Sequence, residues 1–174
     1  AADALLHVMQ SHGLKPSDLA KVVTHVHQGA IDVLGPVVNP TTVHQSKFSM
    51  GTVLAMAAQF GHAGLNEFEQ AFQTEATQAL RDKVEMVLDP EVDGAYPKRW
   101  IGKVSVTTTD GRVLHGRVDE PKGDPGNTLS RQEITDKALR LAAYSGGATP
   151  EAMRKALDAL WHVASWPKVG VLLA

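Results

Sequence analysis

The sequence predicts an α+β fold, in which an antiparallel sheet of about four strands packs against roughly five or six helices. Three observations lead to this prediction. Apolar residues recur at helical spacing near both ends of the chain, residues 100–118 have the pattern of a β-hairpin, and the strands are clustered instead of alternating with helices. The 174 residues fit a single domain, which we place at residues 1–174.

The first part of the chain predicts a helix and then a strand. Leu5, Val8 and Met9 recur at helical spacing, and Gly13 is a typical residue at which such a helix ends. Residues 22–27 alternate with a period of two, which predicts a strand with one buried face.

The middle of the chain predicts a buried helix after a loop. Gly35-Pro36 and Asn39-Pro40 are turn-forming pairs. Residues 48–60 are mostly apolar or small, which is typical of a closely packed helix, and Gly61 ends it. Two helices and a strand are then predicted at residues 65–72, 75–82 and 84–88.

The second half predicts a hairpin followed by two helices. Asp110-Gly111 lies between two alternating runs, which is the strongest short-range signal of a hairpin. Ser130 and Glu133 form a capping box that begins one helix, and Thr149-Pro150 begins the last. The acidic run at residues 89–93 is interpreted as a solvated loop.

Composition excludes several classes of protein. The chain has no cysteine, so it has no disulfide framework, thiolate metal site or cysteine nucleophile. A net charge of −2 disfavours nucleic acid and anionic membranes as partners, and the apolar runs are too short to span a bilayer. No signal peptide is recognised, and we expect a cytoplasmic protein. The chain begins inside a predicted helix, so we expect it to be cut from a longer protein.

Eight histidines raise the question of a metal site. His25 and His27 share one face of the predicted strand, because Val22, Thr24 and Val26 occupy the other. Two imidazoles in this geometry bind a metal only when a third ligand joins them. No third ligand of matching spacing is visible, so we expect an exposed strand face and no metal.

One polar segment, His44 to Thr52, lies where the buried helix begins. The N-terminus of a helix presents free N–H groups and the positive end of the helix dipole, and Lys47 adds a full charge there. A carboxylate would bind well at such a place. In the alternative interpretation Ser46 or Ser49 only caps the helix and Lys47 is solvated. The residues by themselves leave both interpretations open.

At this segment the sequence resembles the MmgE/PrpD family, whose members include 2-methylcitrate dehydratase, cis-aconitate decarboxylase and iminodisuccinate epimerase. The family has Lys-Phe-Ser followed by a hydrophobic residue, a variable one and often Tyr at the start of a buried helix, and residues 46–55 here read Ser-Lys-Phe-Ser-Met-Gly-Thr-Val-Leu-Ala. Other features agree with the family in order and spacing: Asn39-Pro40, Gly61, Leu65–Phe68, Lys83–Met86, Val104–Val106, Asp110-Gly111, Lys122–Pro125, Leu129-Ser130 and Lys137.

The resemblance covers nearly the whole chain and implies the family's smaller, C-terminal α+β domain. The larger all-helical domain carries most of the family's catalytic residues and is absent, as is the Lys-x-Tyr-Pro motif that precedes this domain. The resemblance implies a substrate site between the two domains, a helical domain in the same chain or in a separate subunit, a homodimer, and no cofactor. By position, the expected substrate contacts are Lys47, Ser49 and Thr52, with His44 beside them, and the catalytic residues are unknown.

The resemblance implies chemistry next to a carboxylate of a small polycarboxylate. The simplest expectation is a lyase that dehydrates an acid such as 2-methylcitrate after proton abstraction. Thr52 departs from the family because Tyr often stands there, and Thr is a much poorer acid. This departure favours, as an alternative, an isomerase or epimerase of a dicarboxylate such as iminodisuccinate. An alternative of another class is a non-catalytic binding or assembly module.

Overall fold

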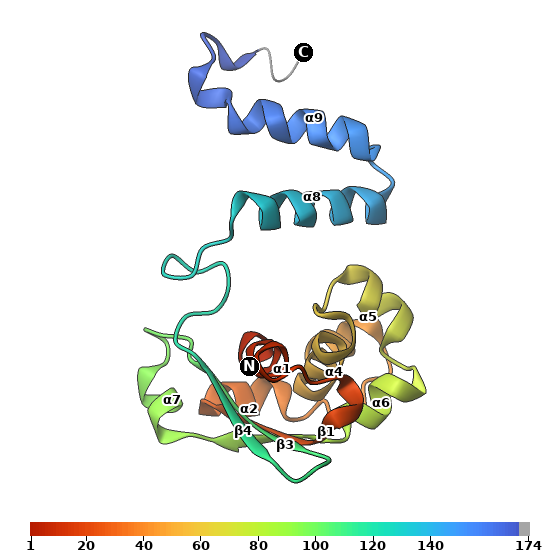
Figure 1. Ribbon diagram of the computed structural model, residues 1–174, viewed down its shortest axis with the longest axis vertical. Helices are drawn as coiled ribbons and strands as arrows, with labels where there is room; N and C mark the ends of the chain where they lie inside the picture. The colour runs from red at the N-terminus through yellow and green to blue at the C-terminus, as the bar shows by residue number, and fades with distance from the viewer. Residues whose placement is uncertain (171–174) are drawn as a thin grey trace. The chain divides into compact units, whose positions relative to one another are not determined.

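The computed structural model describes residues 1–170. The chain divides between Asn127 and Thr128 into two compact units (Figure 1). The first unit contains the sheet, and the second is built from two helices.

The first unit is built on a four-stranded mixed sheet with the order β2-β1-β3-β4. The strands are β1 (Leu19–Val26), β2 (Val84–Leu88), β3 (Gly102–Thr108) and β4 (Val113–Val118). β3 pairs antiparallel with β1 and β4, whereas β2 runs parallel to β1, with Val22 opposite Val84 and Val26 opposite Leu88. A parallel pair requires a long crossover, and residues 27–83 supply one. The predicted α+β class is confirmed, and within the sheet the one departure is the parallel β1–β2 pair.

Seven helices belong to the first unit among the described residues. They are α1 (Ala2–His12), α2 (Gln28–Leu34), α3 (Val43–Lys47), α4 (Met50–Phe60), α5 (Leu65–Ala71), α6 (Glu75–Arg81) and α7 (Pro90–Ala95). The described chain has nine helices in all, more than the sequence predicted, and the additional ones are α2, α3 and α7. With five and six residues, α3 and α7 are too short to show a helical period. The acidic run at residues 89–93 was wrongly interpreted as a loop. Asp89 caps α7, and acidic residues are favourable in the first turn of a helix.

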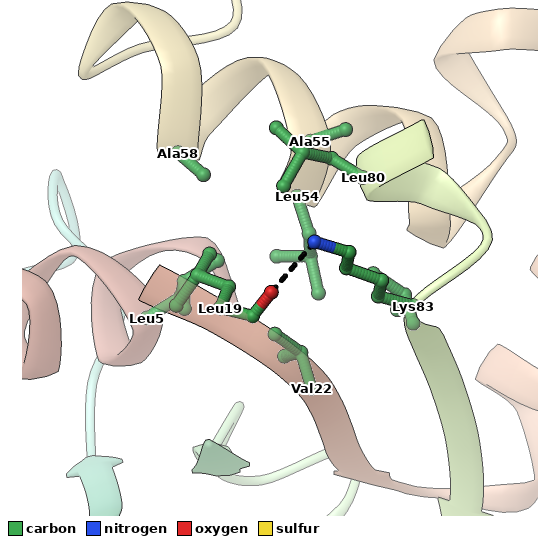
Figure 2. A pocket seen from close by; sticks show the side chains of 9 residues that line it. Leu5, Leu19, Val22, Leu54, Ala55, Ala58, Leu80 and Lys83 are labelled. Atoms are coloured by element: carbon green, nitrogen blue, oxygen red, sulfur yellow. Dashed lines mark hydrogen bonds between the residues drawn. The ribbon is translucent and has the colours of Figure 1, made fainter. Parts of the chain in front are cut away.

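The main core lies between one face of the sheet, α1 and α4, which lie above the sheet in Figure 1. A void of about 10 Å³ lies in this core. Figure 2 shows the side chains that line it, among them Leu5, Leu54 and Ala55. Lys83 reaches its edge and donates to the carbonyl oxygen of Leu19 at 2.7 Å. A void of this size in an apolar setting is at the lower limit for one water molecule, so the core is close to fully packed.

β1 buries the face that its period predicted. Val22, Thr24 and Val26 are all buried. Thr24 has no exposed surface, and its hydroxyl oxygen has no hydrogen-bond partner among the described residues. A buried hydroxyl without a partner loses its bonds to water and gains none in return.

Replacing this hydroxyl by a methyl group is expected to stabilise the protein. We expect Thr24→Val to raise the free energy of unfolding by about 1 kcal/mol, because the two side chains have the same shape. Thr24→Ser is the matched control, which keeps the hydroxyl, removes a buried methyl group and is expected to destabilise by about 1 kcal/mol. Urea denaturation followed by circular dichroism measures both variants. A destabilised Thr24→Val would show that the hydroxyl is satisfied in solution.

The second unit contains α8 (Arg131–Ser145) and α9 (Pro150–Trp161). Both predicted starts are confirmed, because Ser130 and Glu133 form the capping box and Thr149 caps α9. Gly146 ends α8 with φ of 64°, a left-handed conformation that favours glycine. The Arg131 guanidinium lies 4.9 Å from the centre of the Trp161 ring and joins the two helices.

Candidate functional site at the start of helix α4

Two short capping motifs turn the chain from α3 into α4. The Thr42 hydroxyl accepts from the amide of Gln45 at 3.1 Å and begins α3. α3 ends after five residues, and Ser49 then caps α4. The interpretation of Ser49 as a helix cap is therefore confirmed.

Ser49 and Thr52 form a buried pair of hydroxyl groups. Ser49 is 1% exposed and Thr52 is fully buried. The Ser49 oxygen accepts from the Thr52 amide at 3.4 Å, and the two hydroxyl oxygens lie 3.0 Å apart. Thr52 is the one polar residue among the buried residues of α4, and this contact gives its hydroxyl a partner.

Lys47 and His44 lie on the surface of α3. The Lys47 ammonium is 6.0 Å from the centre of the Phe68 ring on α5, at the outer limit of a cation–π contact. The ring of His44 is 5.0 Å from that of Phe48. The structure therefore brings Ser49 and Thr52 together, and it does not bring Lys47 or His44 into contact with them.

An open pocket of about 260 Å³ lies beside the first turn of α4. Its polar side chains come from Ser49 and Arg81, and the first-turn residues Met50 and Gly51 also line it. Its apolar walls come from α2, the loop after it and β2: Ile31, Leu34, Val37, Val38, Val84 and Met86. Among the described residues that line it there is no carboxylate, so the pocket offers positive charge and hydrogen-bond donors.

Sequence reasoning missed Arg81, which lies at the C-terminal end of α6. Its side chain is 11% exposed, and it forms an ion pair with exposed Asp82 at 3.0 Å. A Cβ on Gly51 would lie 2.8 Å from Arg81 Cγ and 3.0 Å from its carbonyl oxygen, so only glycine lets α6 approach α4 this closely. The glycine in the Met50-Gly51-Thr52 stretch was the sequence signal for this contact.

A second polar cluster covers the outer face of the sheet. His25 Nε2 lies 2.9 Å from Ser105 Oγ, which lies 3.1 Å from His115 Nδ1. His27 does not join this cluster, because its Nδ1 accepts from Ala30 and caps α2. Within residues 1–170 no group of three His, Asp or Glu side chains is arranged to hold a metal ion.

Carboxylates and cations of the same face form a chain of ion pairs. Lys103 Nζ lies 2.7 Å from Asp89 and 3.2 Å from Glu91, and Arg117 holds Glu91 through two contacts. The hydrogen bond from Lys103 lowers the pKa of Asp89, and the bond from Arg117 is the largest cause that lowers the pKa of Glu91. These groups stay charged at neutral pH, and each of them is paired with an opposite charge of the same set.

The comparison with protein families decides the identity of the chain. The model of the MmgE/PrpD C-terminal domain matches residues 1–163, which include both compact units as far as the end of α9. The chain belongs to the MmgE/PrpD family. No individual curated protein matches it. MmgE/PrpD proteins are lyases and isomerases, and this chain has their C-terminal domain. Within the described residues, no helix combines the length and the apolar character needed to cross a membrane.

Proposed function

We propose that this domain supplies the substrate-holding part of an MmgE/PrpD lyase that dehydrates a small polycarboxylate such as 2-methylcitrate. In this proposal the start of α4 holds a substrate carboxylate, and the proton-abstracting groups come from the helical domain of the same chain or a separate subunit. A homodimer of such units and a cytoplasmic location complete the proposal.

The pocket at the start of α4 carries this proposal. Ser49, a residue expected to contact substrate, lines it, and positive charge is present in Arg81 on its wall. The first-turn amides of a helix lack acceptors within the helix and favour an anion. Lys47 ends α3 two residues before the Ser49 cap, so its flexible side chain supplies a second cation near this helix start.

Removing the Lys47 charge tests the proposal. We expect 2-methylcitrate to bind the chain with a Kd on the order of 1 mM, and Lys47→Ala to weaken binding about fivefold, because an exposed lysine contributes about 1 kcal/mol to holding a carboxylate. Isothermal titration calorimetry measures the Kd. Lys98→Ala removes another exposed lysine and is the matched control. Equal affinities for both variants and the unaltered chain would remove Lys47 from the site.

The state of Thr52 favours the alternative of an isomerase or epimerase. Thr52 is fully buried and its hydroxyl is bonded to Ser49, so it does not replace the Tyr as an acid. With the helical domain supplied, incubation of substrate in D₂O separates the reactions. Deuterium uptake next to a carboxylate without loss of water indicates an epimerase, and an unsaturated product indicates the lyase.

The remaining alternative is a non-catalytic binding or assembly module. It is favoured over an enzyme if the chain with its helical domain catalyses neither reaction and the polycarboxylate does not bind. Saturable binding that depends on Lys47 would contradict a purely structural role.

A further inference from the structure

The pocket beside α4 has a donor that its own surroundings do not use. Ser49 and Thr52 carry one hydroxyl proton each, and a single hydrogen bond joins them. The second proton has no acceptor among the described residues, although both side chains are buried. Because Ser49 lines the pocket, an acceptor placed there would satisfy this proton.

Arg81 also retains donors toward a ligand. Its Nε and Nη2 atoms both lie 3.0 Å from the same oxygen of Asp82, and Nη1 has no acceptor within residues 1–170. The Asp82 carboxylate is 63% exposed, so water screens this ion pair and leaves much of the guanidinium charge available. A planar guanidinium on the wall of a pocket is suited to a carboxylate.

The rest of the pocket is apolar. Ile31 and Leu34 come from α2, and Val84 and Met86 come from β2. A second charge placed inside the pocket against these side chains would have no partner, which is costly. The walls therefore favour an aliphatic group attached to the carboxylate.

We propose that this pocket binds one carboxylate group that carries a short, uncharged aliphatic chain, with the carboxylate held by Arg81 and the Ser49 hydroxyl. Arg81 is then a specificity-determining residue that sequence comparison along the α4 segment does not reveal. Identifying this carboxylate and its aliphatic chain as part of the enzyme's substrate rests on the proposed function. The preference of the pocket for such a group rests only on the residues that line it.

Titration of the ¹⁵N-labelled chain with butyrate tests the pocket. We expect saturable shifts of the Met50 and Gly51 amide signals, with a Kd on the order of 1 mM. Butyramide has the same shape without the charge and is expected to bind at least tenfold more weakly. Pentanoate is expected to bind more tightly than butyrate by up to about fourfold, the effect of one more buried methylene.

Two variants locate the binding. Arg81→Gln is expected to weaken butyrate binding at least tenfold, whereas Arg99→Gln, which changes an exposed arginine outside the pocket, leaves it unchanged. Leu34→Gln places an amide in the half-buried apolar wall and is expected to abolish the gain from butyrate to pentanoate. Signal dispersion in each spectrum verifies that the variant is folded. If Arg81→Gln is unfolded, Arg81→Lys replaces it. The same tenfold loss is expected for Arg81→Lys, because lysine lacks the planar guanidinium that binds a carboxylate through two hydrogen bonds.

The outcomes separate this inference from the proposed function. Equal binding of butyrate and butyramide, or of butyrate to the unaltered chain and Arg81→Gln, overturns the inference, even where Lys47→Ala supports the polycarboxylate site. Butyrate binding at Gly51 that depends on Arg81, in a chain that does not bind 2-methylcitrate, supports the pocket and contradicts the proposed function.

Discussion

Gly116→Ala is expected to destabilise the first unit by about 2–3 kcal/mol, as overpacked core positions do. Gly116 lies in β4 with α1 directly against it. A Cβ at this position would lie 2.6 Å from the carbonyl oxygen of Ala4, 2.6 Å from Val8 Cγ2 and 3.1 Å from Val104 Cγ2. One of these neighbours is backbone, so α1 must move away from the sheet, and packing of Ala4 and Val8 is lost. Urea denaturation followed by circular dichroism measures the change.

Gly94→Ala is the matched control for this prediction. Gly94 lies in α7, and a Cβ there meets nothing within 4 Å. Alanine is favoured over glycine in a helix, so this variant is expected to be neutral or more stable by up to about 1 kcal/mol. If both variants unfold at the same urea concentration, the close contact of α1 with β4 does not limit stability.

Asp89→Ala is expected to cost about 2 kcal/mol, because one side chain has two structural roles. Its Oδ1 accepts from the amides of Glu91 and Val92 and caps α7, and its Oδ2 receives Lys103 at 2.7 Å. The side chain is only 11% exposed. Asp89→Asn separates the roles, since the amide retains an acceptor for the cap but loses the charge, and it is expected to cost less than Asp89→Ala. Equal stability of Asp89→Ala and the unaltered chain would contradict both roles.

Asp89 also predicts that the free energy of unfolding decreases at acidic pH. The pKa values of Asp89 and Glu91 are lowered from ordinary values of 3.8 and 4.5, Asp89 mainly by Lys103 and Glu91 mainly by Arg117. A lowered pKa means that the folded state binds protons less readily than the unfolded state, so this stabilisation is present above the ordinary values and is lost as the pH falls below about 4. We expect the midpoint of urea unfolding to fall less steeply below pH 4 in Asp89→Asn than in the unaltered chain.

Strong local signals made most of the fold predictable. The Asp110-Gly111 turn, the Ser130–Glu133 capping box and Gly13 each fix the backbone within a few residues. The structure has the hairpin, the start of α8 and the end of α1 at the positions that these three signals predict. The parallel pairing of β1 with β2 was not predictable. It depends on contacts between residues far apart in sequence, and a five-residue strand such as 84–88 looks the same in either direction.

The candidate site was predictable only in part. A serine followed by a buried helix predicts a cap, and Ser49 is one. Lys47 and His44 are close to Ser49 in sequence and were therefore expected beside it. However, α3 ends at Lys47, before Ser49, and carries Lys47 and His44 on its surface. Arg81 lies thirty positions beyond Gly51, and only the packing of α6 against α4 brings it to the pocket.

The parallel β1–β2 pair has a consequence for how the pocket forms. The residues that line the pocket come from both ends of the crossover that joins β1 to β2. α2 and α4 follow β1, Arg81 lies near the end of the crossover, and Met86 lies in β2. Closing a chain segment of this length costs entropy before any long-range contact repays it. The pocket is therefore expected to form late in folding, when β2 pairs with β1. Ligand binding then reports that the chain has reached its native topology, and a bound ligand protects the part of the protein that is slowest to fold.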